Sequence, residues 1–236
     1  RTGQIKNAET MLKSTMHHPA LNIIITNLLQ QLSTATPSET KPILTTPAIG
    51  FAEALLSVAS SFHYDEIIDI AHMFTALSLY LSPDYSTAKI LMADILESRE
   101  MYQEANKIYD SISKDEVTYY PAQLKKTRNY TKQKDFASAE KLLKKLSKQY
   151  DDIQIYMDLG DILRTNSRYS EAIKYYDKAI SKTSDRNTLW VLHYAKGSAL
   201  EQSGLWDEAE KSLMKAYEIK KHYRILNYLG YSWFKQ

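Results

Sequence analysis

The segment Ile155–Ala179, which reads IYMDLGDILRTNSRYSEAIKYYDKA, decides the fold, because its pattern returns further along the chain. A second segment, His193–Ala216, reads HYAKGSALEQSGLWDEAEKSLMKA. In both segments a glycine is followed twelve residues later by an alanine, then four residues on by a large side chain, and three residues further by a second alanine. These positions hold Gly160, Ala172, Tyr176 and Ala179 in the first segment and Gly197, Ala209, Leu213 and Ala216 in the second. Such a recurrence predicts a repeated structural unit.

The alanine that opens the second half of each unit recurs over most of the chain, at Ala71, Ala105, Ala139, Ala172 and Ala209. The intervals are 34, 34, 33 and 37 residues. Each half-unit carries an apolar stripe with helical spacing, and a short turn separates the two halves. One helical hairpin cannot bury both of its stripes alone, so we expect successive hairpins to stack, with the small residues allowing close approach.

The composition excludes several other classes of protein. The 236 residues are 44% hydrophobic and 25% charged with a net charge of +2, as in an ordinary globular chain without a dominant basic surface. Only six glycines and six prolines are present, too few for the turns of a β-sandwich. No cysteine is available for a disulfide or a thiolate metal site, and no run of 18 apolar residues could span a membrane.

No sequence signature of catalysis is present. Phosphate-binding glycine loops, HExxH, GxSxG and EF-hand motifs are all missing, and the six histidines are scattered. We therefore expect no catalytic residue, no metal site and no cofactor.

The recurring pattern resembles the tetratricopeptide repeat, a helix–turn–helix unit of 34 residues. This resemblance implies an all-α, right-handed superhelical solenoid of such hairpins. The segments Thr46–Leu56 and Leu226–Trp233 further resemble long tetratricopeptide proteins of alphaproteobacteria. Many of those proteins carry an export or lipoprotein signal upstream, so this second resemblance implies the cell envelope, with the cytoplasm left open.

The domain organisation follows from the repeats and from one irregular stretch. We expect residues 1–32 to hold a partial repeat and a lone helix over Ala20–Leu32, and residues 33–48, which contain three prolines, to form a linker. Residues 49–236 are predicted to form about five hairpins and a truncated half-repeat. The chain begins without methionine and with incomplete repeats at both ends, which predicts a piece of a longer protein.

The first helices of such an array line a concave groove, and the resemblance implies that this groove binds an extended peptide or a helix of a partner protein. Carrying the groove-facing positions over to this sequence gives a set of mixed charge with apolar and aromatic members. These candidate residues are Ile90, Asp94, Glu97, Leu124, Arg128, Lys132, Met157, Asp161, Arg164, Tyr194, Ser198, Glu201, Asn227 and Tyr231.

Other functions remain open at this point. The ends of the array could mediate self-association into a homo-oligomer. The stretch Lys125–Lys148 has nine basic and two acidic residues, and it could bind an acidic partner, an anionic lipid or nucleic acid. We favour a protein-binding scaffold, do not expect nucleic-acid binding, and place an enzyme last.

Overall fold

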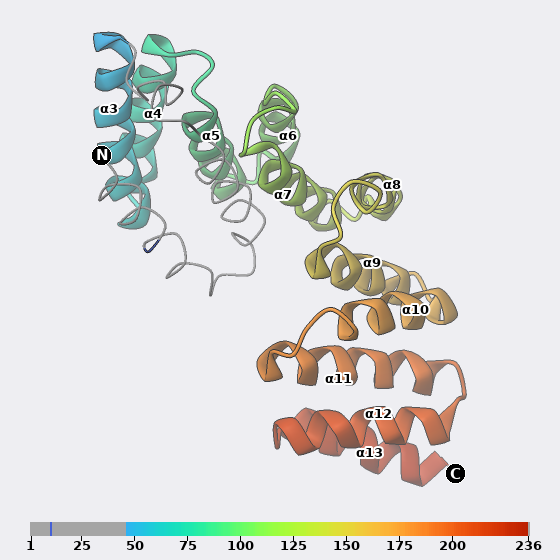
Figure 1. Ribbon diagram of the computed structural model, residues 1–236. Coiled ribbons are helices and arrows are strands. Elements are labelled where there is room, and N and C mark those ends of the chain that lie inside the picture. The colour runs from blue at the N-terminus through green and yellow to red at the C-terminus, as the bar shows by residue number, and fades with distance from the viewer. Residues whose placement is uncertain (1–9, 11–45, 236) are drawn as a thin grey trace. The chain divides into compact units, whose positions relative to one another are not determined.

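A computed structural model describes residue 10 and residues 46–235, and all of its regular elements are helices. The partial repeat and lone helix predicted over residues 1–32 lie outside the described residues, as does the linker up to residue 45. The helices, labelled as in Figure 1, are α3 (Pro47–Tyr64), α4 (Ile68–Leu81), α5 (Ser86–Ser98), α6 (Tyr102–Asp110), α7 (Tyr119–Lys132), α8 (Phe136–Leu146), α9 (Ile153–Thr165), α10 (Tyr169–Ile180), α11 (Arg186–Gln202), α12 (Trp206–Ile219) and α13 (Tyr223–Lys235). The all-α class predicted from the sequence is confirmed.

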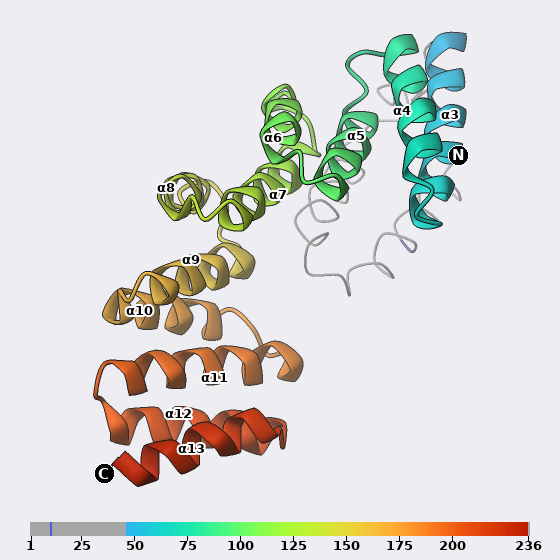
Figure 2. The same ribbon diagram turned by 180° about the vertical axis from the view of Figure 1, so that it is seen from behind.

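The chain divides into two compact units, of which the first ends at Asn129 and the second begins at Tyr130. In the first unit, α3 packs on α4, α4 on α5, and α5 on α6. In the second unit, α8 packs on α9, and the order continues through α10, α11, α12 and α13, so that each helix contacts its neighbours in the sequence. Figures 1 and 2 show the helices of a hairpin running side by side in opposite directions. Each unit is therefore a stack of helical hairpins.

Helix α3 begins slightly earlier than the linker boundary expected from the sequence. Thr46 is its N-cap, and the Thr46 hydroxyl accepts a hydrogen bond from the amide of Ile49 at 3.3 Å. Pro47 occupies the first turn, where the missing N–H would have no helical partner and the fixed φ suits a helix. Pro47 and Ala48 thus belong to the helix, since proline at this place starts a helix rather than breaking one.

Every hairpin turn uses a residue in the left-handed conformation. These residues are Glu66, Glu100, Lys134, Ser167 and Gly204, with φ between 59° and 74°. The amide of the following residue returns to a carbonyl five residues earlier, as from Arg168 to Leu163 at 2.9 Å. Four turns impose this conformation on a residue with a side chain, which shows that hairpin packing outweighs the local backbone cost.

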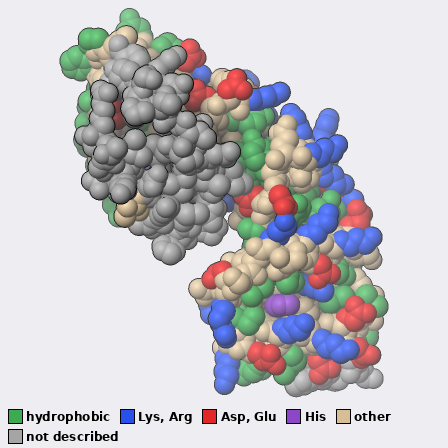
Figure 3. Space-filling model, in the orientation of Figure 1, with side chains coloured by type: hydrophobic (Ala, Val, Ile, Leu, Met, Phe, Trp, Pro, Cys, Tyr) green, Lys and Arg blue, Asp and Glu red, His purple; other side chains and the backbone are tan. Residues whose placement is uncertain are grey.

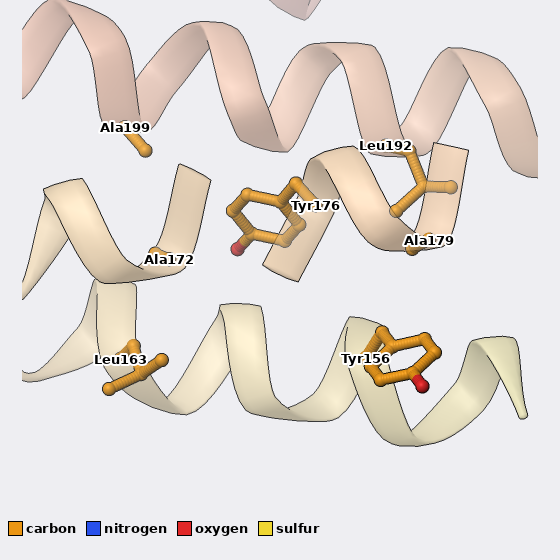
Figure 4. Close-up of a cluster of buried hydrophobic side chains, with 7 residues drawn as sticks. All are labelled: Tyr156, Leu163, Ala172, Tyr176, Ala179, Leu192 and Ala199. Carbon is orange, nitrogen blue, oxygen red and sulfur yellow. The ribbon is translucent and has the colours of Figure 1, made fainter. Parts of the chain in front are cut away.

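The core is built from the alanines that the repeat pattern singled out. All five alanines of the series, and also Ala179 and Ala216, have no exposed surface. In the second unit, the Tyr176 ring lies between Leu163 and Leu192, and alanines occupy the places where the helices approach most closely (Figure 4). The alternation of small and large side chains is what allows stacked hairpins to reach protein-like density.

His193 makes the second unit sensitive to acid. It lies half-buried on α11, and its Nδ1 atom has no hydrogen-bond partner within the described part of the chain. Burial lowers the pKa of His193, and Lys215 and Lys196 lower it further against the opposing effect of Asp177. Because the unfolded chain protonates this residue at its ordinary pKa of about 6.5 while the folded chain resists protonation, stability falls as the pH drops through that value.

We expect the His193→Gln variant to lose part of this sensitivity. Its melting temperature should fall less between pH 7.5 and pH 5.5 than that of the unchanged chain, as measured by circular dichroism. An equal fall in both proteins would show that His193 does not carry the effect.

Candidate binding face on the first helices

The first helices of the second unit form one continuous face. Helix α9 contacts α11, and α11 contacts α13, although a second helix intervenes in the sequence each time. Several candidate groove residues are thereby brought onto neighbouring helices. They are Met157, Asp161 and Arg164 on α9, Tyr194, Ser198 and Glu201 on α11, and Asn227 on α13. We call this surface the α9–α11–α13 face; the side chain of Tyr231, also predicted for it, lies outside the described residues.

A buried tyrosine holds Arg164 in place on this face. The Tyr176 hydroxyl donates a hydrogen bond to Asp161 Oδ1 at 2.7 Å and accepts one from Arg164 Nε at 3.1 Å. Arg164 Nη2 also lies 3.4 Å from Asp161 Oδ1. Burial and the Asp161 carboxylate raise the pKa of Tyr176, so the phenol keeps its proton. The guanidinium is 37% exposed, and it is therefore both oriented by the fold and open to a ligand.

An aromatic pair stands on the neighbouring helices. The rings of Tyr194 on α11 and Tyr228 on α13 meet edge to face with 5.4 Å between centroids. The Ser198 hydroxyl lies 3.5 Å from that of Tyr228, which ties the two helices together. Burial raises the pKa of Tyr194, with Tyr228 adding to the effect. Both rings are only partly buried, so they offer an apolar contact surface beside polar groups.

Not every predicted groove residue is open to solvent. Ser198 and Glu201 are 5% and 4% exposed, and Glu201 accepts a hydrogen bond from Gln202 Nε2 at 2.6 Å. Met157 is half-buried, whereas Asp161 and Asn227 are exposed. The accessible part of the face therefore consists of Arg164, the tyrosine pair and the exposed polar residues around them.

The first unit repeats the tyrosine arrangement with a different charge. The Tyr109 hydroxyl lies 2.8 Å from Glu97 Oε1 and 3.1 Å from Asp94 Oδ1, and Lys125 on α7 pairs with Asp94 at 2.7 Å. Burial and the two carboxylates raise the pKa of Tyr109 far above its ordinary value. Here the position equivalent to Arg164 holds Glu97, which makes this part of the first-helix surface acidic.

The remaining candidates differ in their exposure. Ile90 is half-buried against the core of the first unit and Leu124 is 5% exposed, so both contribute to packing. Arg128 and Lys132 are exposed on α7. Arg128 lies in the first unit, and Lys132 follows the boundary between the units.

Part of the basic stretch is neutralised within the fold. Lys125 pairs with Asp94, Lys126 with Asp110 at 2.6 Å, and Lys144 with Glu140 at 2.6 Å. These ion pairs lie on different helices and do not form one surface. The arrangement favours a solvated, locally balanced surface over a dedicated site for polyanions.

Sequence reasoning missed the residues that connect neighbouring repeats. Lys125 and Tyr228 occupy the same place in their units, and each reaches the preceding first helix, at Asp94 and Ser198 respectively. The partners are 31 and 30 residues apart, close to the repeat length. Searching for polar pairs at that separation would have found them.

Neither a metal centre nor a membrane-spanning element is found where the structure describes the chain. No group of three or more His, Asp or Glu side chains there is placed to hold a metal ion. None of the described helices has the length and apolar character needed to cross a bilayer. The chemistry offered by the described residues is recognition through shape, charge and aromatic surface.

The fold and this face define a helical-repeat protein, and comparisons with known proteins identify the repeat. Tetratricopeptide repeats are recognised at residues 124–187 and 192–223, so the chain contains repeats of that family, as predicted. Arrays of this kind generally act as binding scaffolds through their surfaces. The suggested likeness to alphaproteobacterial proteins is not confirmed and stays a prediction.

The chain is similar to a repeat-containing protein of Bacillus subtilis (strain 168), YpiA. The two are 23% identical over 182 residues, which cover 71% of this chain and 40% of YpiA. Among solved structures it is similar to YrrB, described as a TPR protein with an unusual peptide-binding site, with a TM-score of 0.58 and 16% identity over 74% of this chain and 89% of YrrB. It is also similar to MamA from Desulfovibrio magneticus RS-1, with a TM-score of 0.62 and 16% identity over 72% of this chain and 95% of that one. At these identities, the structural likeness establishes the fold.

Proposed function

We propose that this chain is a protein-interaction scaffold that binds an extended peptide or a helix of a partner on the α9–α11–α13 face, without catalysis of its own. The observation that carries the proposal is the placement of Arg164 and the Tyr194–Tyr228 pair on three adjacent first helices. An oriented guanidinium beside partly buried aromatic rings is the combination enriched among the residues that dominate protein interfaces. The printed description of YrrB as peptide-binding supports the same reading.

The geometry suggests how a partner would be held. Arg164 would form charge-assisted hydrogen bonds with a carboxylate or a backbone carbonyl of the partner. An apolar side chain of the partner would pack against Tyr194 and Tyr228, and the exposed amide of Asn227 would accept or donate at the edge. Because Tyr176 and Asp161 already orient the guanidinium, little side-chain entropy would be lost on binding.

Substitutions on this face should abolish partner binding while leaving the fold intact. We expect Arg164→Glu and Tyr194→Ala each to lower the affinity for a captured partner by about tenfold or more, as for residues central to an interface. The measurement is quantitative capture from cells of the source organism, followed by titration of the identified partner peptide by fluorescence anisotropy. Lys174→Glu, a charge reversal at an exposed residue of α10, is the matched control and should bind normally.

The outcome separates the alternatives. A partner that is lost with Arg164→Glu and with Tyr194→Ala but kept with Lys174→Glu supports the proposed face. If Lys174→Glu weakens capture as strongly, the contact is general electrostatic attraction, and the α9–α11–α13 face is not the binding site.

A further inference from the structure

The outer face of α4 is apolar and open. Ile70, Met73, Leu77 and Tyr80 are spaced by three, four and three residues, and they are 37%, 51%, 45% and 83% exposed. They lie on the opposite side of the helix from its buried residues Ala71, Thr75 and Ser78. In Figure 3 hydrophobic side chains gather at the α3–α4 end of the first unit, whereas basic and acidic side chains are interspersed over the second unit. Within the residues that the structure describes, nothing covers this face.

The same positions in the other second helices are polar, which makes the apolar face specific to α4. The position of Met73, two residues after the buried alanine, holds an exposed lysine in every other hairpin, namely Lys107, Lys141, Lys174 and Lys211. The position of Leu77 holds an exposed serine or lysine in each of them, namely Ser111, Lys145, Lys178 and Lys215. Hairpin formation therefore does not require apolar side chains at these positions. Four exposed apolar residues in a row on one helix indicate a surface that is covered when the protein is complete.

We propose that the segment Ala20–Leu32 of this same chain covers the face as an amphipathic helix. Its sequence, ALNIIITNLLQQL, contains no charged residue. Leu21, Ile24, Ile25, Leu28 and Leu32 follow helical spacing and would form one apolar stripe, opposite Asn22, Thr26 and Gln30. An apolar stripe on the segment and an apolar face on α4 each need a partner, and each provides what the other lacks.

The connection between the two is long enough and favours the chain's own segment over a second molecule. The Ser78 hydroxyl donates to the Ala52 carbonyl at 2.7 Å, so the end of α4 that carries Tyr80 lies beside the start of α3, where the chain enters the described unit. The 14 residues between Leu32 and Pro47 reach about 45 Å when extended, against about 21 Å for the whole length of α4. A tether of this kind gives an effective concentration in the millimolar range, above that of a second copy in ordinary solution.

This docking is independent of the binding proposed for the α9–α11–α13 face. It would use the N-terminal segment to close one side of the first unit, and it would leave the second unit's first helices open to a partner. A partner that displaced the segment from α4 would at the same time expose two apolar stripes.

Disulfide trapping tests the proposal directly, because the natural chain has no cysteine. Leu28→Cys is combined either with Leu77→Cys on the α4 face or with Lys107→Cys at an exposed position of α6 in the same unit. Under mild oxidation we expect the first pair to form a disulfide within one molecule in most of the protein, and the control pair in only a minor part. Non-reducing electrophoresis and peptide mass spectrometry identify the bond.

Other outcomes overturn the proposal. A disulfide that joins two molecules and increases with protein concentration would assign the face to a second copy. Equal trapping with Leu77→Cys and with Lys107→Cys would show that the segment does not dock on α4, and would leave the face to an external partner.

A second measurement does not depend on engineered cysteines. The double variant Met73→Lys with Leu77→Lys gives α4 the outer face that α8, α10 and α12 already have, so the hairpin itself should fold normally. We expect hydrogen exchange in residues 20–32 to accelerate by about tenfold or more once the apolar contact is lost, while α3 and α4 stay protected. Ile24→Asp with Leu28→Asp should reproduce the effect from the other side. Exchange in residues 20–32 that is already fast in the unchanged chain, or that neither double variant alters, would contradict the proposal.

Discussion

Replacing Gly160 with alanine is expected to destabilise the second unit by about 1–2 kcal/mol. A methyl group at this position would lie 2.5 Å from Tyr176 Cε1 and 2.8 Å from its Cδ1. The ring cannot easily move away, because it is 1% exposed and its hydroxyl is bonded to Asp161 and Arg164. Overpacking costs about 1–3 kcal/mol, while the better helix propensity of alanine returns up to about 1 kcal/mol.

The measurement is urea unfolding followed by tryptophan fluorescence, since Trp190, Trp206 and Trp233 all belong to the second unit. Gly230→Ala on α13 is the matched control, because a methyl group there meets no atom within 4 Å. The control should be neutral or slightly stabilising. Equal stability of the two variants would show that Gly160 does not set the distance between α9 and α10.

Leu163→Ala is expected to have the largest effect of any single truncation that we consider, a loss of about 2–5 kcal/mol. Leu163 has no exposed surface and packs with Ala172, Tyr176 and Ala199 in the core of the second unit (Figure 4). The cavity would lie between consecutive hairpins, and in a repeat array such a loss is felt mainly by the neighbouring units. Amide hydrogen exchange should therefore accelerate most in α9, α10 and α11.

Leu226→Ala provides the control for this truncation. Leu226 is in the same unit but 48% exposed on α13, so its removal should change the free energy of unfolding by less than about 1 kcal/mol. If both leucine variants unfolded at the same urea concentration, the cluster around Leu163 would not be the stabilising core of the unit.

The hairpin architecture was accessible from the sequence because it depends on local, repeated information. Alanines at intervals near 34 residues marked the close approaches of the helices, and those alanines are buried in the structure. Breaks in helical periodicity located the turns. The left-handed residues in those turns were not foreseen, because Glu66, Glu100 and Lys134 have no intrinsic preference for that conformation and adopt it only when packing on both sides fixes the turn.

The candidate face could be predicted only in part. Helical spacing placed Asp161, Arg164 and Tyr194 on first helices, but it could not show that Glu201 is buried or that Tyr176 orients the guanidinium of Arg164. Those facts depend on how one helix packs against the next. The apolar face of α4 was likewise unrecognised, since a stripe of Ile70, Met73 and Leu77 resembles a core stripe until the structure shows which side of α4 is buried.

The sequence by itself determined that this protein is a succession of paired helices, because the spacing of small and large side chains within a hairpin is written into each 34-residue period. Only the tertiary structure decided which polar groups meet across repeats, which turns take the left-handed form and which apolar stripe stays uncovered. The physical reason is that these features join residues about 30 positions apart or depend on a neighbouring helix, and their energies exist only after the hairpins have stacked.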